Sequence, residues 1–266
     1  MAEEVVLYEA SEGVATLTLN RPERLNAWTR ELGARCFELV EQASRDPEVR
    51  VIVITGAGRG FCAGADMELL RSIGGGSAVV GEQQRVYPSS LLHVPKPVIA
   101  AINGPAAGLG FVLALMCDLR FAAAGAKLTT AFVRRGLIAE YASAWMLPRL
   151  IGPARALDLL LSGRVLLAEE ALELGVVNKV VPAEELMAQT YAYARDLAAN
   201  CSPRSMAVIK SQVYRDLGSS LEDALERSLS EMDASLETDD FREGVASYVE
   251  QRTPRFPALE REAARR

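Results

Sequence analysis

A stretch of 20 residues without a charged side chain, 98–117, constrains the fold more than any other part of the sequence. Its length alone would suit a membrane-spanning helix. The turn-forming residues 103–105 (Asn-Gly-Pro) would interrupt such a helix, and residues 98–102 are rich in β-branched side chains, as in a buried strand. The stretch therefore predicts a buried strand, a glycine-rich turn and a helix that begins near residues 108–110.

The predicted helix has apolar side chains at four-residue intervals, at Phe111, Leu115 and Leu119. Almost every side chain between these positions is also apolar, so the helix should be buried on all sides. The first N–H groups of a helix have no partner within it. We therefore expect the N–H groups at this turn to face a cavity, where they would stabilise an anion.

Composition limits the class of protein. A chain of 266 residues, half of them hydrophobic, can bury a large core and form one main domain with a smaller appendage. The net charge of −6 argues against nucleic acid as the main ligand. The N-terminus lacks the features of a secretion signal, and four widely spaced cysteines favour reduced thiols. We expect a cytoplasmic protein that binds neither nucleic acid nor membranes.

Strand and helix patterns alternate along residues 1–181, which predicts an α/β core with a parallel sheet. The predicted strands cover residues 14–19, 51–54, 98–102, 119–122, 127–129 and 176–180. A glycine-rich segment at 73–77 and its neighbourhood up to Glu82 are predicted to be mobile and to precede a helix over 83–92. Residues 182–266 form a second region with long amphipathic helices over 184–199, 203–216, 221–236 and 239–251.

Two of the predicted strands end in turns made of small residues, 60–66 and 103–110. Small residues allow backbone N–H groups to approach a ligand oxygen. If the two strands are neighbours, N–H groups from both turns could converge on one oxygen and form an oxyanion hole. Tight packing of a buried turn is the alternative interpretation for Gly104, Gly108 and Gly110. Neither turn matches a P-loop or a convincing dinucleotide fingerprint.

Together with other segments of the chain, these two turns are specific enough to indicate a protein family. The chain resembles the crotonase family, also called the enoyl-CoA hydratase/isomerase family, in motifs that follow the family's order from about residue 4 to Phe256. The motifs are Leu17-Thr-Leu-Asn-Arg-Pro-Glu-Arg-Leu-Asn26, Val53-Ile-Thr-Gly56, Gly60-Phe-Cys-Ala-Gly-Ala-Asp66, Lys96-Pro-Val-Ile-Ala-Ala-Ile-Asn-Gly104, Met116-Cys-Asp118 and Phe241-Arg-Glu-Gly244.

The resemblance implies a crotonase-like ββα spiral core and a C-terminal helical trimerisation region. It implies a homotrimer or a dimer of trimers. The substrate would be an acyl-CoA thioester, so coenzyme A is part of the substrate and no separate cofactor is expected. The resemblance assigns the thioester oxygen to the backbone N–H groups of Ala63 and Leu109, and leucine at 109 replaces the family's usual glycine.

The acids depart from the hydratase pattern. Hydratases of this family use two glutamates, and the matching positions here are Val112 and Phe132, which cannot transfer a proton. Glu140 instead matches the acid of family isomerases, which shuttles one proton. Its apolar sequence neighbours predict a buried carboxyl group with a raised pKa. The alternative is a surface glutamate that begins the next helix.

The resemblance also implies contacts with coenzyme A. Arg24 matches a basic position near the phosphates, and Tyr248 and Phe256 match aromatic positions near the nucleotide, in one subunit or across a subunit boundary. Tyr248 has an alternative role in helix packing, and Gln251 stands where some members have lysine. The adenine and pantetheine would lie along a run of five residues: Ala63, Gly64, Ala65, Asp66 and Met67.

Three further residues of reactive types are interpreted as structural. Asp66 is expected to be the N-cap of the next helix rather than a catalytic acid. His93 matches no catalytic position of the family, and Cys62 is expected to be a small packing residue. No cluster of side chains suggests a metal site.

The sequence therefore predicts an enzyme that isomerises an enoyl-CoA thioester, with Glu140 as the proton shuttle. Hydration of an enoyl-CoA by Glu140 and water is an alternative. A non-catalytic acyl-CoA-binding protein is an alternative of another class.

Overall fold

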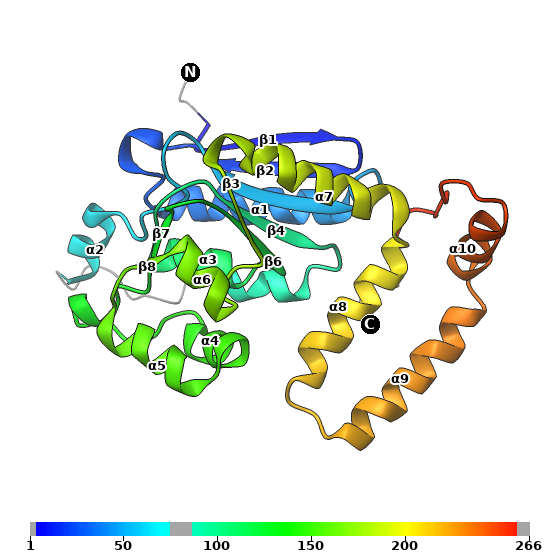
Figure 1. Ribbon diagram of the computed structural model, residues 1–266. Helices are drawn as coiled ribbons and strands as arrows, with labels where there is room; N and C mark the ends of the chain where they lie inside the picture. The colour runs from blue at the N-terminus through cyan, green and yellow to red at the C-terminus, as the bar shows by residue number, and fades with distance from the viewer. Residues whose placement is uncertain (1–3, 75–86, 260–266) are drawn as a thin grey trace.

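The computed structural model describes residues 4–74 and 87–259 and contains a six-stranded sheet with helices on both faces (Figure 1). The strand order is β1-β2-β3-β4-β6-β9. β1 and β2 form an antiparallel hairpin, and every other pair of neighbours is parallel. The bounds are β1 (Val6–Ser11), β2 (Val14–Leu19), β3 (Val51–Gly56), β4 (Val98–Ile102), β6 (Leu119–Ala123) and β9 (Lys179–Val181). The predicted α/β core with a parallel sheet is confirmed, apart from β1, which runs antiparallel to β2.

Helices cover both faces of the sheet, so β3 and β4 are buried along their whole length, as their mainly apolar sequences predict. α1 (Arg30–Arg45) and α3 (Leu109–Leu115) pack on one face. α7 (Leu186–Asn200) packs on the other face through Leu186, Ala194 and Ala198. α7 therefore packs on the core sheet although it lies after the predicted boundary between residues 181 and 182.

A smaller sheet lies beside the main one and has the order β5-β7-β8, with β5 (Ala106–Ala107), β7 (Lys127–Thr129) and β8 (Leu166–Leu167). β5 directly follows the turn at the end of β4, so the small sheet begins at the glycine-rich turn. The adjoining helices are α4 (Ser143–Ile151), α5 (Pro153–Ser162) and α6 (Ala168–Leu174).

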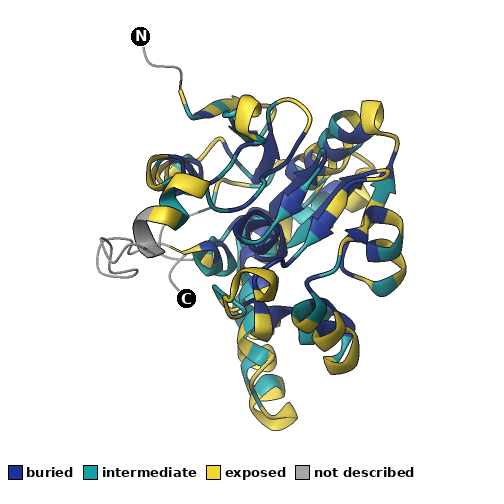
Figure 2. Ribbon diagram, turned by 90° about the vertical axis from the view of Figure 1, so that its left-hand side faces the viewer, coloured by how far each residue is buried: buried dark blue, intermediate teal, exposed yellow. Residues whose placement is uncertain are grey.

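The last three helices form an arm that projects from the core, and many of their residues are exposed (Figures 1 and 2). They are α8 (Pro203–Asp216), α9 (Leu221–Leu236) and α10 (Asp239–Val249). The arm is fixed to the core at α8, where the Lys210 ammonium lies 2.7 Å from the Asp118 carboxylate. The Tyr214 hydroxyl bonds to the same carboxylate at 2.9 Å. None of the described helices combines the length and the apolar character needed to cross a bilayer.

The apolar spacing that begins at Phe111 continues to Leu119, but the helix ends before the predicted strand over 119–122. α3 ends at Leu115, and Leu119 begins β6. Asp118 causes the change of direction, because its N–H donates to the Val98 carbonyl and its carboxylate accepts from the Val98 N–H. The buried Arg120 guanidinium then donates to carbonyls at the end of α3. These bonds end the helix although the apolar spacing continues.

The last predicted strand is also corrected. Residues 176 and 177 are not paired with the sheet, because the N–H groups of Val176 and Val177 both donate to the carbonyl of Ala171 within α6. Pairing begins at Lys179, opposite Phe121. Most of the predicted mobile segment and the start of the predicted helix over 83–92 lie outside the described residues. The described end of that helix is the 3-10 turn Pro88–His93.

Candidate active site

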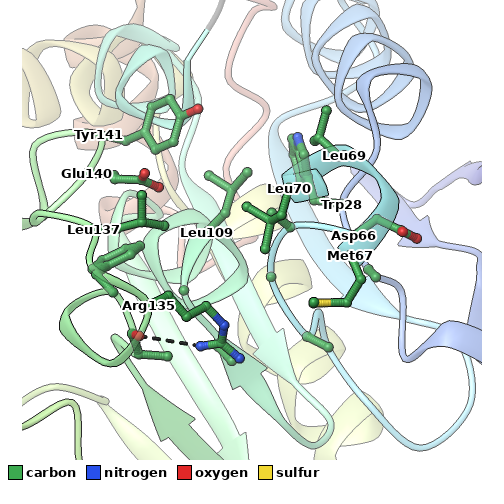
Figure 3. Close-up of a pocket in the computed structure, with 18 of the residues that line it drawn as sticks. Trp28, Asp66, Met67, Leu69, Leu70, Leu109, Arg135, Leu137, Glu140 and Tyr141 are labelled. Carbon is green, nitrogen blue, oxygen red and sulfur yellow. Dashed lines mark hydrogen bonds between the residues drawn. The ribbon is translucent and has the colours of Figure 1, made fainter. Parts of the chain in front are cut away.

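A cavity of about 650 Å³ lies at the ends of β3 and β4. The segments after these strands line it, together with the start of α1, helix α2 (Met67–Gly74) and the loop that leads to α4. Figure 3 shows Glu140, Leu137 and Tyr141 on one side, Asp66 and Met67 on the opposite side, and Leu109 between them. The cavity therefore joins both glycine-rich turns to the predicted acid.

The two turns are held together through their backbones. The N–H groups of Phe61 and Cys62 donate to the Pro105 carbonyl, each at 3.1 Å, and the Ala107 N–H donates to the Cys62 carbonyl at 3.0 Å. A methyl group at Gly110 would lie 2.2 Å from the Cys62 oxygen, which is too close for any side chain. The packing interpretation of the turn glycines therefore holds at Gly110, and this packing also brings the two turns together.

Among the backbone N–H groups beside the cavity, those of Ala65 and Leu109, on the two glycine-rich turns, have no hydrogen-bond partner in the described part of the chain. Leu109 is the first residue of α3, where such groups are unpaired. The Ala63 N–H, by contrast, donates to the Leu25 carbonyl at 2.9 Å. The prediction that Ala63 is an oxyanion donor is therefore wrong, although Ala63 does line the cavity.

Gly64 explains why the free N–H group belongs to Ala65, two residues after Ala63. Its φ of +90° is in a region that favours glycine, and it turns the chain between Ala63 and Ala65. The residues on both sides of Ala65 bond to Trp28: the Trp28 N–H donates to the Gly64 carbonyl, and the Asp66 N–H donates to the Trp28 carbonyl. The motif alone does not reveal which N–H group remains free.

Glu140 lies in the loop before α4, half-buried, and extends toward Leu109 (Figure 3). Burial raises the pKa of its carboxyl group, as predicted. The alternative, a surface residue that begins the next helix, is contradicted because α4 begins three residues later at Ser143. Tyr141 and Ala142, which link Glu140 to α4, have φ values of 47° and 62°.

The two positions that match hydratase glutamates have different surroundings. Val112 is completely buried in the core and is not among the residues that line the cavity. Phe132 does line the cavity, and its Cε1 atom would lie 3.8 Å from a methyl group at Gly108. Neither position brings a titratable group to the cavity.

Asp66 lines the cavity but is already paired. Its Oδ1 atom accepts the Glu68 N–H and its Oδ2 atom accepts the Arg21 guanidinium, both at 3.0 Å. The bond from the Glu68 N–H and the nearby Arg21 lower the pKa of Asp66. Because α2 begins at the next residue, Asp66 has the position and bonding expected of an N-cap.

The residues assigned to coenzyme A fall into two groups. Arg24, Gly64, Ala65, Asp66 and Met67 all line the cavity.

Tyr248 and Phe256 do not line the cavity. Tyr248 is 86% exposed on α10, which lies on the opposite side of the chain from α2 (Figure 1). The Phe256 ring lies beside Gly244, and its carbonyl accepts the Arg50 guanidinium at 2.7 Å. Within one chain, these two residues are not brought to the cavity.

The remaining reactive residues are not placed for chemistry. His93 is exposed and is not among the residues that line the cavity. Cys62 is fully buried, and burial raises the pKa of its thiol to about 12, which agrees with a packing role. The described residues contain no group of three or more His, Cys, Asp or Glu side chains arranged to hold a metal ion.

Sequence reasoning missed several residues that line the cavity: Trp28, Arg30, Leu70, Arg135, Leu137 and Tyr141. Arg135 illustrates why. It is adjacent to Arg134 in the 3-10 turn Val133–Arg135, and only the turn decides which side chain faces the cavity. The Arg134 guanidinium donates to the Ser162 carbonyl. The Arg135 guanidinium lies in the cavity wall, and its one hydrogen bond to a described residue is a long bond of 3.4 Å to the Ala131 carbonyl.

Comparisons with known proteins show which family the chain belongs to. The profile of the family described as "Enoyl-CoA hydratase/isomerase" matches residues 9–258. The chain is 38% identical to "1,2-epoxyphenylacetyl-CoA isomerase" of Escherichia coli (strain K12), over 95% of this chain and 98% of that protein.

Two solved structures are also similar. One, of a "probable enoyl-CoA hydratase/isomerase" from Mycobacterium abscessus, is 32% identical, with a TM-score of 0.88 over 96% of this chain and 99% of that one. The other, of "enoyl-coA hydratase EchA12_1" from Mycobacterium marinum, is 54% identical, with a TM-score of 0.69 over 80% of this chain and 98% of that one. The expected crotonase-like core is therefore confirmed.

Proposed function

Because the chain belongs to the enoyl-CoA hydratase/isomerase family and is an enzyme of the crotonase superfamily, we propose that it shifts the double bond of an enoyl-CoA thioester. Glu140 is the proposed proton shuttle. The observation that carries this proposal is the acid content of the cavity. Its described lining contains two carboxyl groups, Glu140 and Asp66, and Asp66 is bonded to Arg21.

A double-bond shift requires one acid. The Glu140 carboxylate removes a proton from the carbon beside the thioester carbonyl, and the electron pair of that C–H bond passes into the conjugated system. Negative charge collects on the thioester oxygen. The protonated Glu140 then returns the proton two carbons away, so no water and no second acid are needed. The raised pKa of Glu140 suits both halves of this transfer.

The oxygen would be held by the free N–H groups of Leu109 and Ala65, with Ala65 in place of the Ala63 donor expected from the sequence. Donors fixed in this way stabilise the enolate more than the substrate, because the charge develops on that oxygen during the reaction. Each such donor typically contributes about 3 to 4 kcal/mol to transition-state stabilisation. The coenzyme A part of the substrate would lie along residues 64–67, with Arg24 near its phosphates.

The proposal is tested by supplying a 3-enoyl-CoA and a 2-enoyl-CoA separately and comparing wild type with Glu140→Gln. We expect the 3-enoyl thioester to become the 2-enoyl thioester, with kcat about 100- to 10,000-fold lower in the variant. Glu173→Gln, an exposed glutamate on α6, is the matched control and should keep wild-type turnover. Full turnover by Glu140→Gln on every accepted thioester would contradict the role of Glu140.

The same assay separates the alternatives. Hydration of the 2-enoyl thioester without any double-bond shift would favour the hydratase alternative, in which Glu140 activates water. Tight acyl-CoA binding without turnover across a broad panel of thioesters would favour a binding protein. An epoxyacyl-CoA belongs in this panel, because a relative is named as a 1,2-epoxyphenylacetyl-CoA isomerase and Phe132 and Tyr141 give the cavity aromatic walls.

We further propose that the arm packs against other copies of the chain in a homotrimer or a dimer of trimers. Along α9, five apolar side chains are each at least 49% exposed: Leu221, Leu225, Leu229, Met232 and Leu236. Monomeric proteins rarely expose such a continuous apolar stripe. Light scattering should give three or six times the 28.7 kDa mass of one chain, and a mass of one chain would contradict this proposal.

A further inference from the structure

Two apolar side chains border the space between Glu140 and the proposed oxyanion donors. Leu109 is 7% exposed and Phe132 is 4% exposed, and both line the cavity. They flank the same turn, because the Phe132 ring lies over Gly108, the residue before Leu109. In Figure 3 the Leu109 side chain lies between Glu140 and the wall that carries Leu70.

The position of Leu109 follows from its proposed role. An N–H group and the Cβ atom of the same residue are attached to neighbouring atoms, the backbone nitrogen and Cα. An oxygen bound to the Leu109 N–H therefore lies close to the Leu109 side chain. The carbon atoms of a thioester whose oxygen binds there would be next to an isobutyl group rather than next to the open space that a glycine would leave.

The lining around Leu109 and Phe132 does not favour a bound water molecule. A buried water molecule needs room and about two to four polar partners. Leu109 and Phe132 fill part of the space and offer no side-chain hydrogen bond. Val112, at the other position that matches a hydratase glutamate, is sealed in the core. A water molecule on this side of the cavity would therefore have to be held by Glu140, Tyr141 or Arg135 and not by Leu109 or Phe132.

We propose that Leu109 and Phe132 exclude water from the space between Glu140 and the thioester, so that the proton taken from the substrate returns to the same molecule. This inference rests on the proposed isomerase function. It makes both residues determinants of reaction specificity, because the enolate is reprotonated by Glu140 before solvent protons exchange and before water can add. Exclusion of water also strengthens the electrostatic interactions inside the cavity.

The test follows a label in the product. A 3-enoyl-CoA carrying deuterium at C2 is converted in ordinary water, and NMR measures at low conversion how much deuterium appears at C4 of the 2-enoyl product. We expect wild type to transfer most of the label. Leu109→Ala keeps the backbone N–H and should lower the ratio of transferred to exchanged label by about threefold or more, equivalent to ~0.7 kcal/mol between return and exchange.

Phe132→Ala is a second variant in case Leu109→Ala fails to fold, and it should lower the transferred fraction in the same direction. Leu172→Ala is the matched control, since it removes an exposed leucine side chain on α6 that does not line the cavity and should leave the transferred fraction at the wild-type value. Isomerised product in which solvent hydrogen has replaced all the label would overturn this inference alone. Absence of isomerised product from wild type would overturn the proposed function as well.

Discussion

The two walls of the cavity are built in opposite ways. The wall formed by the turns after β3 and β4 is fixed by backbone contacts so close that a methyl group at Gly110 would lie 2.2 Å from a carbonyl oxygen. The wall formed by residues 131–142 is largely exposed or half-buried. Three of its residues, Ala131, Tyr141 and Ala142, have positive φ values although none is glycine.

This difference matches the two proposed tasks. Holding a negative charge requires donors that do not move, and the first wall supplies them from backbone buried in the core. Moving a proton requires a carboxyl group raised in pKa, and the second wall places one on strained backbone. A side chain in the left-handed region costs roughly 1 kcal/mol or more, and such strain recurs at active sites. The first wall should therefore stabilise the fold, whereas the second should destabilise it.

The largest expected effect is on the first wall. Gly110→Ala would place a methyl group against the Cys62 backbone, which cannot move without displacing the neighbouring turn. We expect the free energy of unfolding to fall by about 3 kcal/mol, the upper range for overpacking, as measured by urea denaturation.

Gly218→Ala is the matched control. A methyl group at Gly218 would meet no atom within 4 Å, and its φ is outside the left-handed region. The same chemical change should leave the unfolding free energy within about 0.5 kcal/mol of wild type. Equal effects at both glycines would show that the first wall is not tightly packed, and the proposed difference between the two walls would be lost.

A smaller effect of opposite sign is expected on the second wall. Ala142→Gly relieves the strain of a φ of 62° but increases the freedom of the unfolded chain, so we expect a net gain of ~0.5 kcal/mol. Turnover should fall, because glycine next to the Glu140 loop permits other conformations. Ala139→Gly, in the same loop without a positive φ, should lose stability. If both variants lose stability equally, residue 142 is not strained.

Much of the fold was predictable from the sequence, because it depends on apolar periodicity and on end signals. The predicted helices over 203–216 and 221–236 match α8 and α9 at both ends, where Ser202 and Ser220 accept N–H bonds as N-caps. The extents of α3 and β9 were not predictable, because carbonyl and carboxylate contacts from distant segments decide where they end.

The candidate site was predictable in its parts but not in its geometry. The motifs indicated both turns and Glu140, and the structure brings them to one cavity. The motif does not reveal that Gly64 turns the chain, so the sequence favours Ala63 as a donor although its N–H group donates to the Leu25 carbonyl. The cavity lining comes from several segments of the chain. Residues such as Trp28 and Tyr141 therefore have no signature within their own segments.

The smallest expected effect concerns the charge on the second wall. Burial raises the folded-state pKa of Glu140 above its usual value, so the folded chain binds the proton more tightly than the unfolded chain. The resulting stability is present at pH values below the unfolded pKa and is lost as pH rises through the folded pKa. Glu140→Gln stays neutral throughout, so its advantage in unfolding free energy over wild type should grow from about pH 4 to about pH 7.

Because Glu140 is only half-buried, solvent screening should limit this growth to a few tenths of a kcal/mol. Urea denaturation at a series of pH values measures it, with Glu173→Gln as an exposed control whose difference from wild type should not change with pH in this way. A difference that is flat or shrinks with pH would mean that Glu140 is solvated like a surface residue. In that case the second wall would not destabilise the fold through its acid, and the contrast between the walls would depend on backbone strain alone.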